Sequence, residues 1–140
     1  MSGIQIIGLR EFRAKVDGFA RSLPSSIRRS SGEAADLIVK VSRARVPLGP
    51  GTGGHARESI RKVADGREVR VVEGGSGYPY MPWLDFGGTI RKGSKKPVKR
   101  AFFKQGRYIW NVHQTYGTRI KAIMDGALEG ASHESGLDLD

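Results

Sequence analysis

Residues 60–72 read IRKVADGREVRVV, and this stretch decides the fold class. Two runs of β-type composition flank Asp65-Gly66, and Asp-Gly between such runs is a strong signal for a β-hairpin with a two-residue turn. In the second run, valines alternate with Arg70, which is the two-residue period of a strand with one polar face. The stretch therefore predicts two antiparallel strands joined by a tight turn.

Two amphipathic helices are predicted before this hairpin. The first ends at Pro24, because the residue before a proline is pushed out of the helical region. Ser25 or Ser26 caps the second, and Pro47 closes it. Because the link between them is short, we expect the two helices to pack as an antiparallel pair. Their apolar residues recur at helical spacing: Leu9, Phe12, Val16, Phe19, Ala20 and Leu23, then Ile27, Ala34, Leu37, Ile38, Val41 and Ala44.

Further strands and one long helix complete the predicted chain. Residues 3–8 and 99–104 have the composition of strands, and apolar residues share one helical face from Asn111 to Ala131. Strands grouped between helices predict an α+β fold, with an antiparallel sheet packed by the N-terminal helical pair and the long C-terminal helix. We expect one domain over residues 1–131. Residues 132–140 are polar and acidic and are expected to form a flexible tail.

Composition narrows the class of protein. The chain has 140 residues, enough for one domain, and 24 Lys and Arg against 14 Asp and Glu give a formal charge of +10. Such a charge favours nucleic acid, an acidic protein surface or a membrane face as partner. The absence of cysteine excludes disulfides and Cys-based zinc or nucleophile sites. With no apolar run near about 20 residues and no signal-peptide pattern, we expect a soluble cytoplasmic product without membrane contact.

No motif for catalysis stands out. Residues 49–54 superficially resemble a phosphate-binding loop, but His55-Ala56 stand where the loop needs Lys and then Ser or Thr. The three histidines of the chain are scattered, with no acidic partner at metal-ligand spacing. Asp85 is a single carboxylate among aromatic residues, which suits a loop or interface hydrogen bond and not a two-carboxylate mechanism. We predict no catalytic residue, no metal, no cofactor and no enzymatic activity.

The sharpest charge feature is the basic stretch 91–107, which holds eight cations and no anion, with aromatic residues among them. This composition suits single-stranded nucleic acid, yet no RNP motif, zinc finger or helix-turn-helix accompanies it. Three interpretations stay open: non-specific contact with DNA, contact with an acidic protein, or a solvated loop. The candidate partner-binding cations are Arg91, Lys92, Lys95, Lys96, Lys99 and Arg100.

A compact aromatic block precedes the basic stretch. Large aromatic residues in a short segment bounded by glycines bury much area at low entropic cost. We therefore expect this block to anchor a core or a subunit interface. The candidate residues are Tyr80, Trp83, Leu84, Asp85 and Phe86.

Three segments, taken in order, resemble the neck (head–tail joining) proteins of siphophages, the minor tail protein Z-like family. The first holds Val46-Pro47, then Thr52-Gly53, then Ala56-Arg57-Glu58-Ser59-Ile60, similar to the family's turn leading into a strand. The second is YMPWLDFGGT, residues 80–89, and the third is PVKRAF, residues 97–102, ahead of the last helix. Asp85 stands where the family more often has Glu.

The resemblance implies a structural subunit without catalytic residues. Such proteins form a ring, by implication of six copies, between the capsid connector and the tail of the virion, and they are made in the host cytoplasm. The implied partners are the chain itself, a head-completion (stopper) protein, a tail-tube or tail-terminator protein, and packaged DNA. The alternative is a small non-specific nucleic-acid-binding protein acting alone. A toxin or nuclease module is a third class, which the lack of an acid–base set disfavours.

Overall fold

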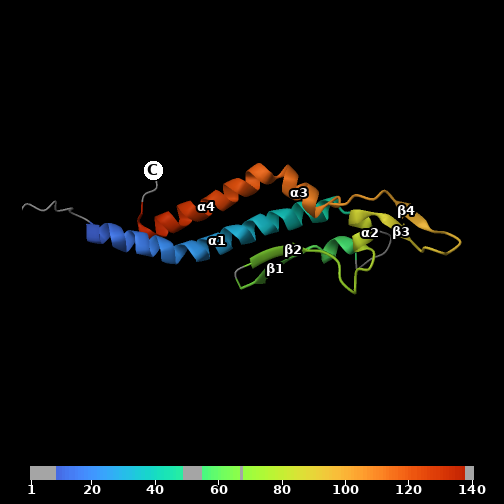
Figure 1. Ribbon diagram of the computed structural model, residues 1–140, viewed down its shortest axis with the longest axis horizontal. Coiled ribbons are helices and arrows are strands. Elements are labelled where there is room, and N and C mark those ends of the chain that lie inside the picture. Colours follow the sequence, from blue (N-terminus) through green and yellow to red (C-terminus); the bar gives the residue numbers. More distant parts are fainter. Residues whose placement is uncertain (1–8, 49–54, 67, 138–140) are drawn as a thin grey trace, which may run out of the picture.

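The computed structural model describes residues 9–48, 55–66 and 68–137, and the molecule is elongated (Figure 1). Its longest element, α1 (Leu9–Arg45), lies beside α4 (Gly117–Ser135) over much of its length. The remaining elements gather toward one end of α1. They are η1 (Ala56–Ser59), β1 (Arg61–Asp65), β2 (Glu68–Val72), α2 (Met81–Phe86), β3 (Gly88–Ile90), β4 (Val98–Arg100) and α3 (Ile109–Thr115).

The predicted break at Pro24 is wrong, because α1 is one continuous helix of 37 residues that contains this proline. Proline removes one hydrogen bond to the carbonyl four residues earlier, which here belongs to Ala20. Both residues are exposed, so water can reach that carbonyl. Contacts with α4 hold the helix on either side of the proline: Gly18 lies against Ser135, and Ser26 Oγ donates to the Ala127 carbonyl at 2.7 Å. The expected helical pair is therefore a single helix.

The predicted C-terminal helix is two helices, α3 and α4, with a bend at Tyr116. α4 continues to Ser135, so residues 132–135 are helical and do not belong to a tail. Gly136 ends it in the left-handed conformation (φ 72°), where the Leu137 amide donates to the Ser132 carbonyl at 3.0 Å. This is the stop that a glycine after a helix provides.

The α+β class is confirmed, but the strands form two separate antiparallel sheets of two strands each. β1 pairs with β2 from Arg61↔Val72 to Asp65↔Glu68, so the hairpin predicted at Asp65-Gly66 is present, with Gly66 at φ 52°. β3 pairs with β4 from Gly88↔Arg100. The strand expected over 99–104 runs only from Val98 to Arg100, and the one expected over 3–8 lies outside the described residues.

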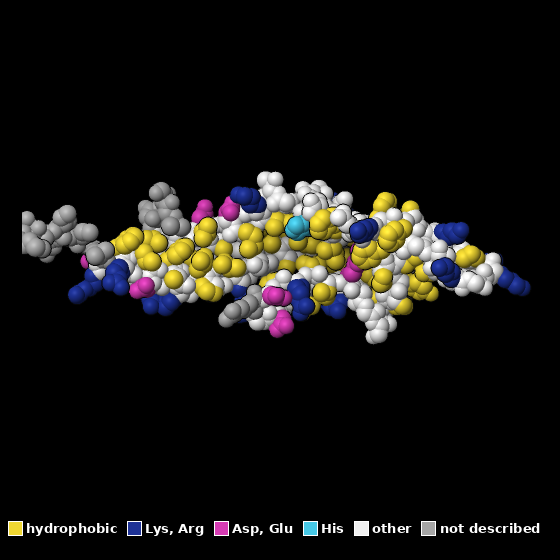
Figure 2. All heavy atoms as spheres, viewed as in Figure 1, with side chains coloured by type: hydrophobic (Ala, Val, Ile, Leu, Met, Phe, Trp, Pro, Cys, Tyr) yellow, Lys and Arg dark blue, Asp and Glu magenta, His cyan; other side chains and the backbone are white. Residues whose placement is uncertain are grey.

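The core is small and lies where α1, η1, α2 and α3 meet. Its buried cluster is Val46, Ile60, Met81 and Tyr108. Of the ten buried hydrophobic residues in the described part of the chain, four are alanines of α1 and α4. Ten large hydrophobic residues of the described ranges are exposed, and apolar side chains run along the visible face of the helix pair (Figure 2). Apolar surface on this scale is typical of a chain that associates.

Candidate functional site

A basic hairpin, residues 88–100, projects from the end of the molecule opposite the N-terminal end of α1 (Figure 1). β3 and β4 are its two arms, and residues 91–97 join them. Figure 2 shows its cations spread over that end of the molecule. No ion pair within the described residues involves it. Five of its predicted partner-binding cations are exposed: Arg91, Lys92, Lys95, Lys96 and Lys99.

Arg100, the sixth predicted cation, is partly buried against the body of the molecule. Its Nε donates to the Leu84 carbonyl at 3.0 Å and one terminal nitrogen donates to the Tyr108 hydroxyl at 3.2 Å. The guanidinium carbon also lies 5.7 Å from the centre of the Trp83 ring, within cation–π range. Arg100 therefore attaches the basic hairpin to the body of the molecule.

The predicted aromatic block forms α2 and the start of the hairpin. Trp83 Nε1 donates to the Gly88 carbonyl at 3.1 Å, and Leu84 packs against the buried cluster. Tyr80 is 54% exposed and faces solvent. Gly87 lies between block and hairpin at φ 85°, where a Cβ would meet the Ala101 carbonyl oxygen at 2.0 Å. Only glycine fits this close approach.

Asp85 is buried, with 2% of its surface exposed, and makes the loop hydrogen bonds expected of it. Its Oδ1 accepts from the backbone amides of Arg107 at 2.5 Å and Tyr108 at 3.0 Å. The Arg107 guanidinium donates in turn to the carbonyls of Asp85 and Ala101. Asp85 thus fixes the chain that leads into α3.

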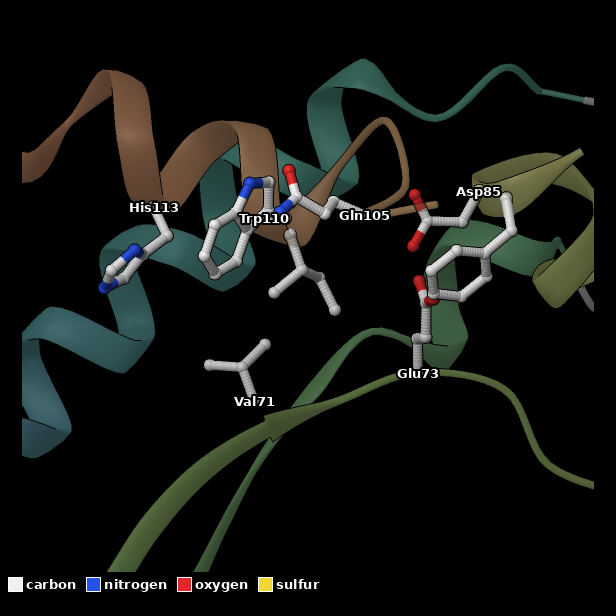
Figure 3. Close-up of a pocket in the computed structure, with 8 residues that line it drawn as sticks. Val71, Glu73, Asp85, Gln105, Trp110 and His113 are labelled. Carbon is white, nitrogen blue, oxygen red and sulfur yellow. The ribbon is translucent and has the colours of Figure 1, made fainter. Parts of the chain in front are cut away.

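Asp85 is not a lone carboxylate, contrary to the sequence interpretation. Glu73, which follows β2, points its carboxyl group toward that of Asp85 (Figure 3). Burial, followed by the hydrogen bond and the charge of Asp85, raises the pKa of Glu73 to about 9. Oε2 of Glu73 is buried and meets no donor within the described residues. Near neutral pH Glu73 is therefore protonated and shares its proton with Asp85.

These two carboxyl groups form one end of an open pocket of about 460 Å³, here called the acidic pocket (Figure 3). Gln105 and His113 also line it, and the His113 ring stacks on Trp110 with centroids 6.0 Å apart. Its apolar walls are Val71, Phe86, Ile109 and Trp110. Such a pocket suits an apolar stem that ends in a hydrogen-bonding or cationic group.

No sequence signal marked Glu73, which stands 12 positions before Asp85, directly after the valine-rich strand β2. Neither residue belongs to a spaced acid motif, and they meet only because the fold brings both of them to the lining of one pocket. Among the described residues, no group of three or more His, Asp or Glu could hold a metal ion. His113 lines the acidic pocket, whereas His55 and His133 lie elsewhere.

No protein-family model matches the chain, and no match is found among curated proteins or among solved structures. Within the described residues, no helix has both the length and the apolar composition needed to cross a membrane.

Proposed function

We propose that the chain is a structural subunit of the head-to-tail connector of a tailed bacteriophage. It would form a ring, of six copies by the resemblance, in the neck or tail of the virion. Its partners would be the head-completion protein on one side and a tail-tube or tail-terminator protein on the other. In this role the chain is not an enzyme and needs no cofactor.

The observation that carries the proposal is the apolar face of the helix pair. Phe12 is 55% exposed and Val16 37%, both on α1, while Leu128 of α4 is 48% exposed. Burial of apolar surface contributes about 25 cal/mol per Å², so covering these side chains with neighbouring copies is favourable. A face that meets a different face of the next copy closes into a ring when the rotation allows it. This arrangement agrees with the ring that the three sequence segments imply.

The mass of the purified full-length chain in solution tests this proposal. We expect mass photometry to find a single closed species and negative-stain images to show rings, without added nucleic acid. A chain that stays monomeric at about 100 µM between pH 6 and 9 would contradict the proposal.

A second candidate function is non-specific binding of nucleic acid, and the exposed basic hairpin favours it. Phe102 and Phe103 follow the hairpin and are 68% and 51% exposed, so cations and aromatic faces are both available to a strand. Binding through phosphates weakens linearly in the logarithm of salt, with a slope of about −0.7 per phosphate for single strands. A steep slope from a monomeric protein would favour this function over the ring.

A further inference from the structure

We propose that the acidic pocket receives a lysine or arginine side chain from the tip of the basic hairpin of a second copy of this chain. The inference rests on the proposed function, because it supplies a contact between consecutive subunits of the ring. It names the occupant of the pocket, the residues that recognise it and the chemistry of the contact.

The shape of the acidic pocket suits a basic side chain. Val71, Phe86 and Ile109 offer apolar walls for a methylene stem, and the two carboxyl groups lie at one end (Figure 3). Trp110 is 44% exposed at the pocket, and an indole ring near an ammonium group adds a favourable cation–π contact. An uncharged apolar side chain would contact the apolar walls but would offer no hydrogen-bond donor to the two carboxyl groups.

Among the residues that the structure describes, no ion pair involves either of these carboxyl groups. Arg107, from the loop before α3, is committed to the carbonyls of Asp85 and Ala101. Arg61 of β1 donates to the carbonyls of Ser59 and Gly74. His113 of α3 lines the pocket but stacks on Trp110. Burial, followed by the hydrogen bond and the charge of Asp85, raises the pKa of Glu73, and its buried Oε2 meets no donor among the described residues.

An incoming ammonium or guanidinium group would complete this site. It donates to the Glu73 carboxyl and, as an opposite charge close by, favours the ionised form. A charge-assisted hydrogen bond from the incoming cation to Glu73 then replaces the hydrogen bond between Glu73 and Asp85. A contact formed at a pH between the lowered pKa of Glu73 in the contact and its pKa of about 9 in the single chain therefore releases a proton.

The basic hairpin of the same chain carries cations that match the acidic pocket. The five exposed cations of the basic hairpin have no ion-pair partner within the described residues, and the hairpin projects away from the helix pair (Figure 1). Hairpin and pocket occupy different parts of the surface, so their contact is head-to-tail. Contacts of this kind generate rings when the rotation between copies closes. A second copy therefore fits the pocket by charge and is compatible with the ring of the proposed function.

Glu73→Gln tests the pocket, because the amide keeps the size and the hydrogen-bond donor of the protonated acid but cannot ionise. We expect this variant to melt no lower than wild type at pH 7 and to assemble at least tenfold more weakly in sedimentation velocity. Raising the pH from 6 to 8 should strengthen wild-type assembly up to tenfold per unit. The variant should lose that dependence on pH.

The hairpin is tested by changing Lys92, Lys95 and Lys96 together to glutamine. Its matched control removes three exposed cations without ion pairs elsewhere, Arg28, Lys40 and Arg119. The hairpin variant should assemble at least tenfold more weakly, and the control should assemble like wild type. Mixing the hairpin variant with Glu73→Gln leaves one intact contact per pair, so the mixture should form heterodimers and stop there.

The possible failures are distinguishable. If wild type assembles and both variants assemble equally well with the same pH dependence, the pocket contact is wrong and the ring stands. Equal loss of assembly in the hairpin variant and its charge-matched control would also overturn the contact, because net charge alone would explain it. Wild type that remains monomeric under all these conditions overturns the proposed function and this contact together.

Discussion

The helix pair and the region around α2 are stabilised by different kinds of interaction. α1 and α4 meet through small residues: Gly18 lies against Ser135, and Ser26 lies against Gly130 and donates to the Ala127 carbonyl, while large apolar side chains stay exposed. The region around α2 is joined by charged groups bonded to backbone atoms, through Asp85, Arg100 and Arg107. The first region leaves large apolar side chains exposed, whereas the second gives its buried Asp85 hydrogen-bond donors within a single chain. Substitutions in the two regions should therefore differ in what they change.

The largest effect is expected at Asp85. Asp85→Ala leaves the buried amides of Arg107 and Tyr108 without an acceptor, and each unsatisfied buried group costs about 1–3 kcal/mol. We expect the free energy of unfolding to fall by about 3 kcal/mol in urea titrations. Gly106→Ala should act similarly, because its Cβ would lie 2.6 Å from Asp85 Oδ1 at a φ of 80°. Wild-type stability in both variants would show that α2 is not anchored in this way.

The next largest effect should have the opposite sign. Pro24→Ala restores a hydrogen bond in the middle of α1, where proline costs about 3 kcal/mol relative to alanine. Proline also restricts the unfolded chain, which offsets up to about 1 kcal/mol of the gain. We therefore expect Pro24→Ala to raise the free energy of unfolding by about 2 kcal/mol, measured in urea. A loss of stability would mean that the helix needs a bend at this proline.

Pro24 also shows where sequence reasoning fails. Local preference predicts a helix end at a proline, but packing against α4 on both sides of it outweighs the loss of one hydrogen bond at an exposed position. The hairpin at Asp65-Gly66 was predictable because its turn chemistry and its alternating valines agree. Elements whose local signals agree are predictable, and elements decided by distant partners are not.

The acidic pocket could not be predicted from the sequence, because distant residues form it. Asp85 was a candidate residue because of its aromatic neighbours, yet its carboxyl partner Glu73 lies 12 positions earlier, after β2, and its hydrogen-bond donors are backbone amides. Likewise, the sequence could not separate Lys99 from Arg100. These neighbours on β4 differ only in which side of the strand faces the body of the molecule.

Lys99 and Arg100 form a matched pair that sharpens the comparison. Arg100→Gln removes donors to the Leu84 carbonyl and the Tyr108 hydroxyl, so we expect a loss of about 1–2 kcal/mol. Lys99→Gln changes an exposed side chain and should shift stability by no more than about 0.5 kcal/mol. Thermal unfolding of both variants at one salt concentration provides the measurement. Equal losses of stability in the two variants would contradict the hydrogen bonds that Arg100 makes to Leu84 and Tyr108.

The smallest effect on stability is expected on the helix pair, where the effect on assembly should be largest. Phe12 is 55% exposed, so Phe12→Gln removes little packing from the single chain and should change its free energy of unfolding by at most about 0.5 kcal/mol. In an assembly that covers this face, the same change replaces a buried ring by an amide. It should weaken each subunit contact by about 2 kcal/mol, or roughly thirtyfold.

A control for Phe12→Gln lies on the same helix. Arg13→Gln changes an exposed neighbour outside the apolar residues of α1 and should leave both stability and assembly unchanged. Urea titration at low protein concentration isolates the single chain, and sedimentation velocity at increasing concentration follows the assembly. If Phe12→Gln destabilises the monomer, the Phe12 side chain belongs to the core of the single chain. If it changes neither quantity, the apolar face of α1 meets no neighbour, and the association must come from the acidic pocket and the basic hairpin alone.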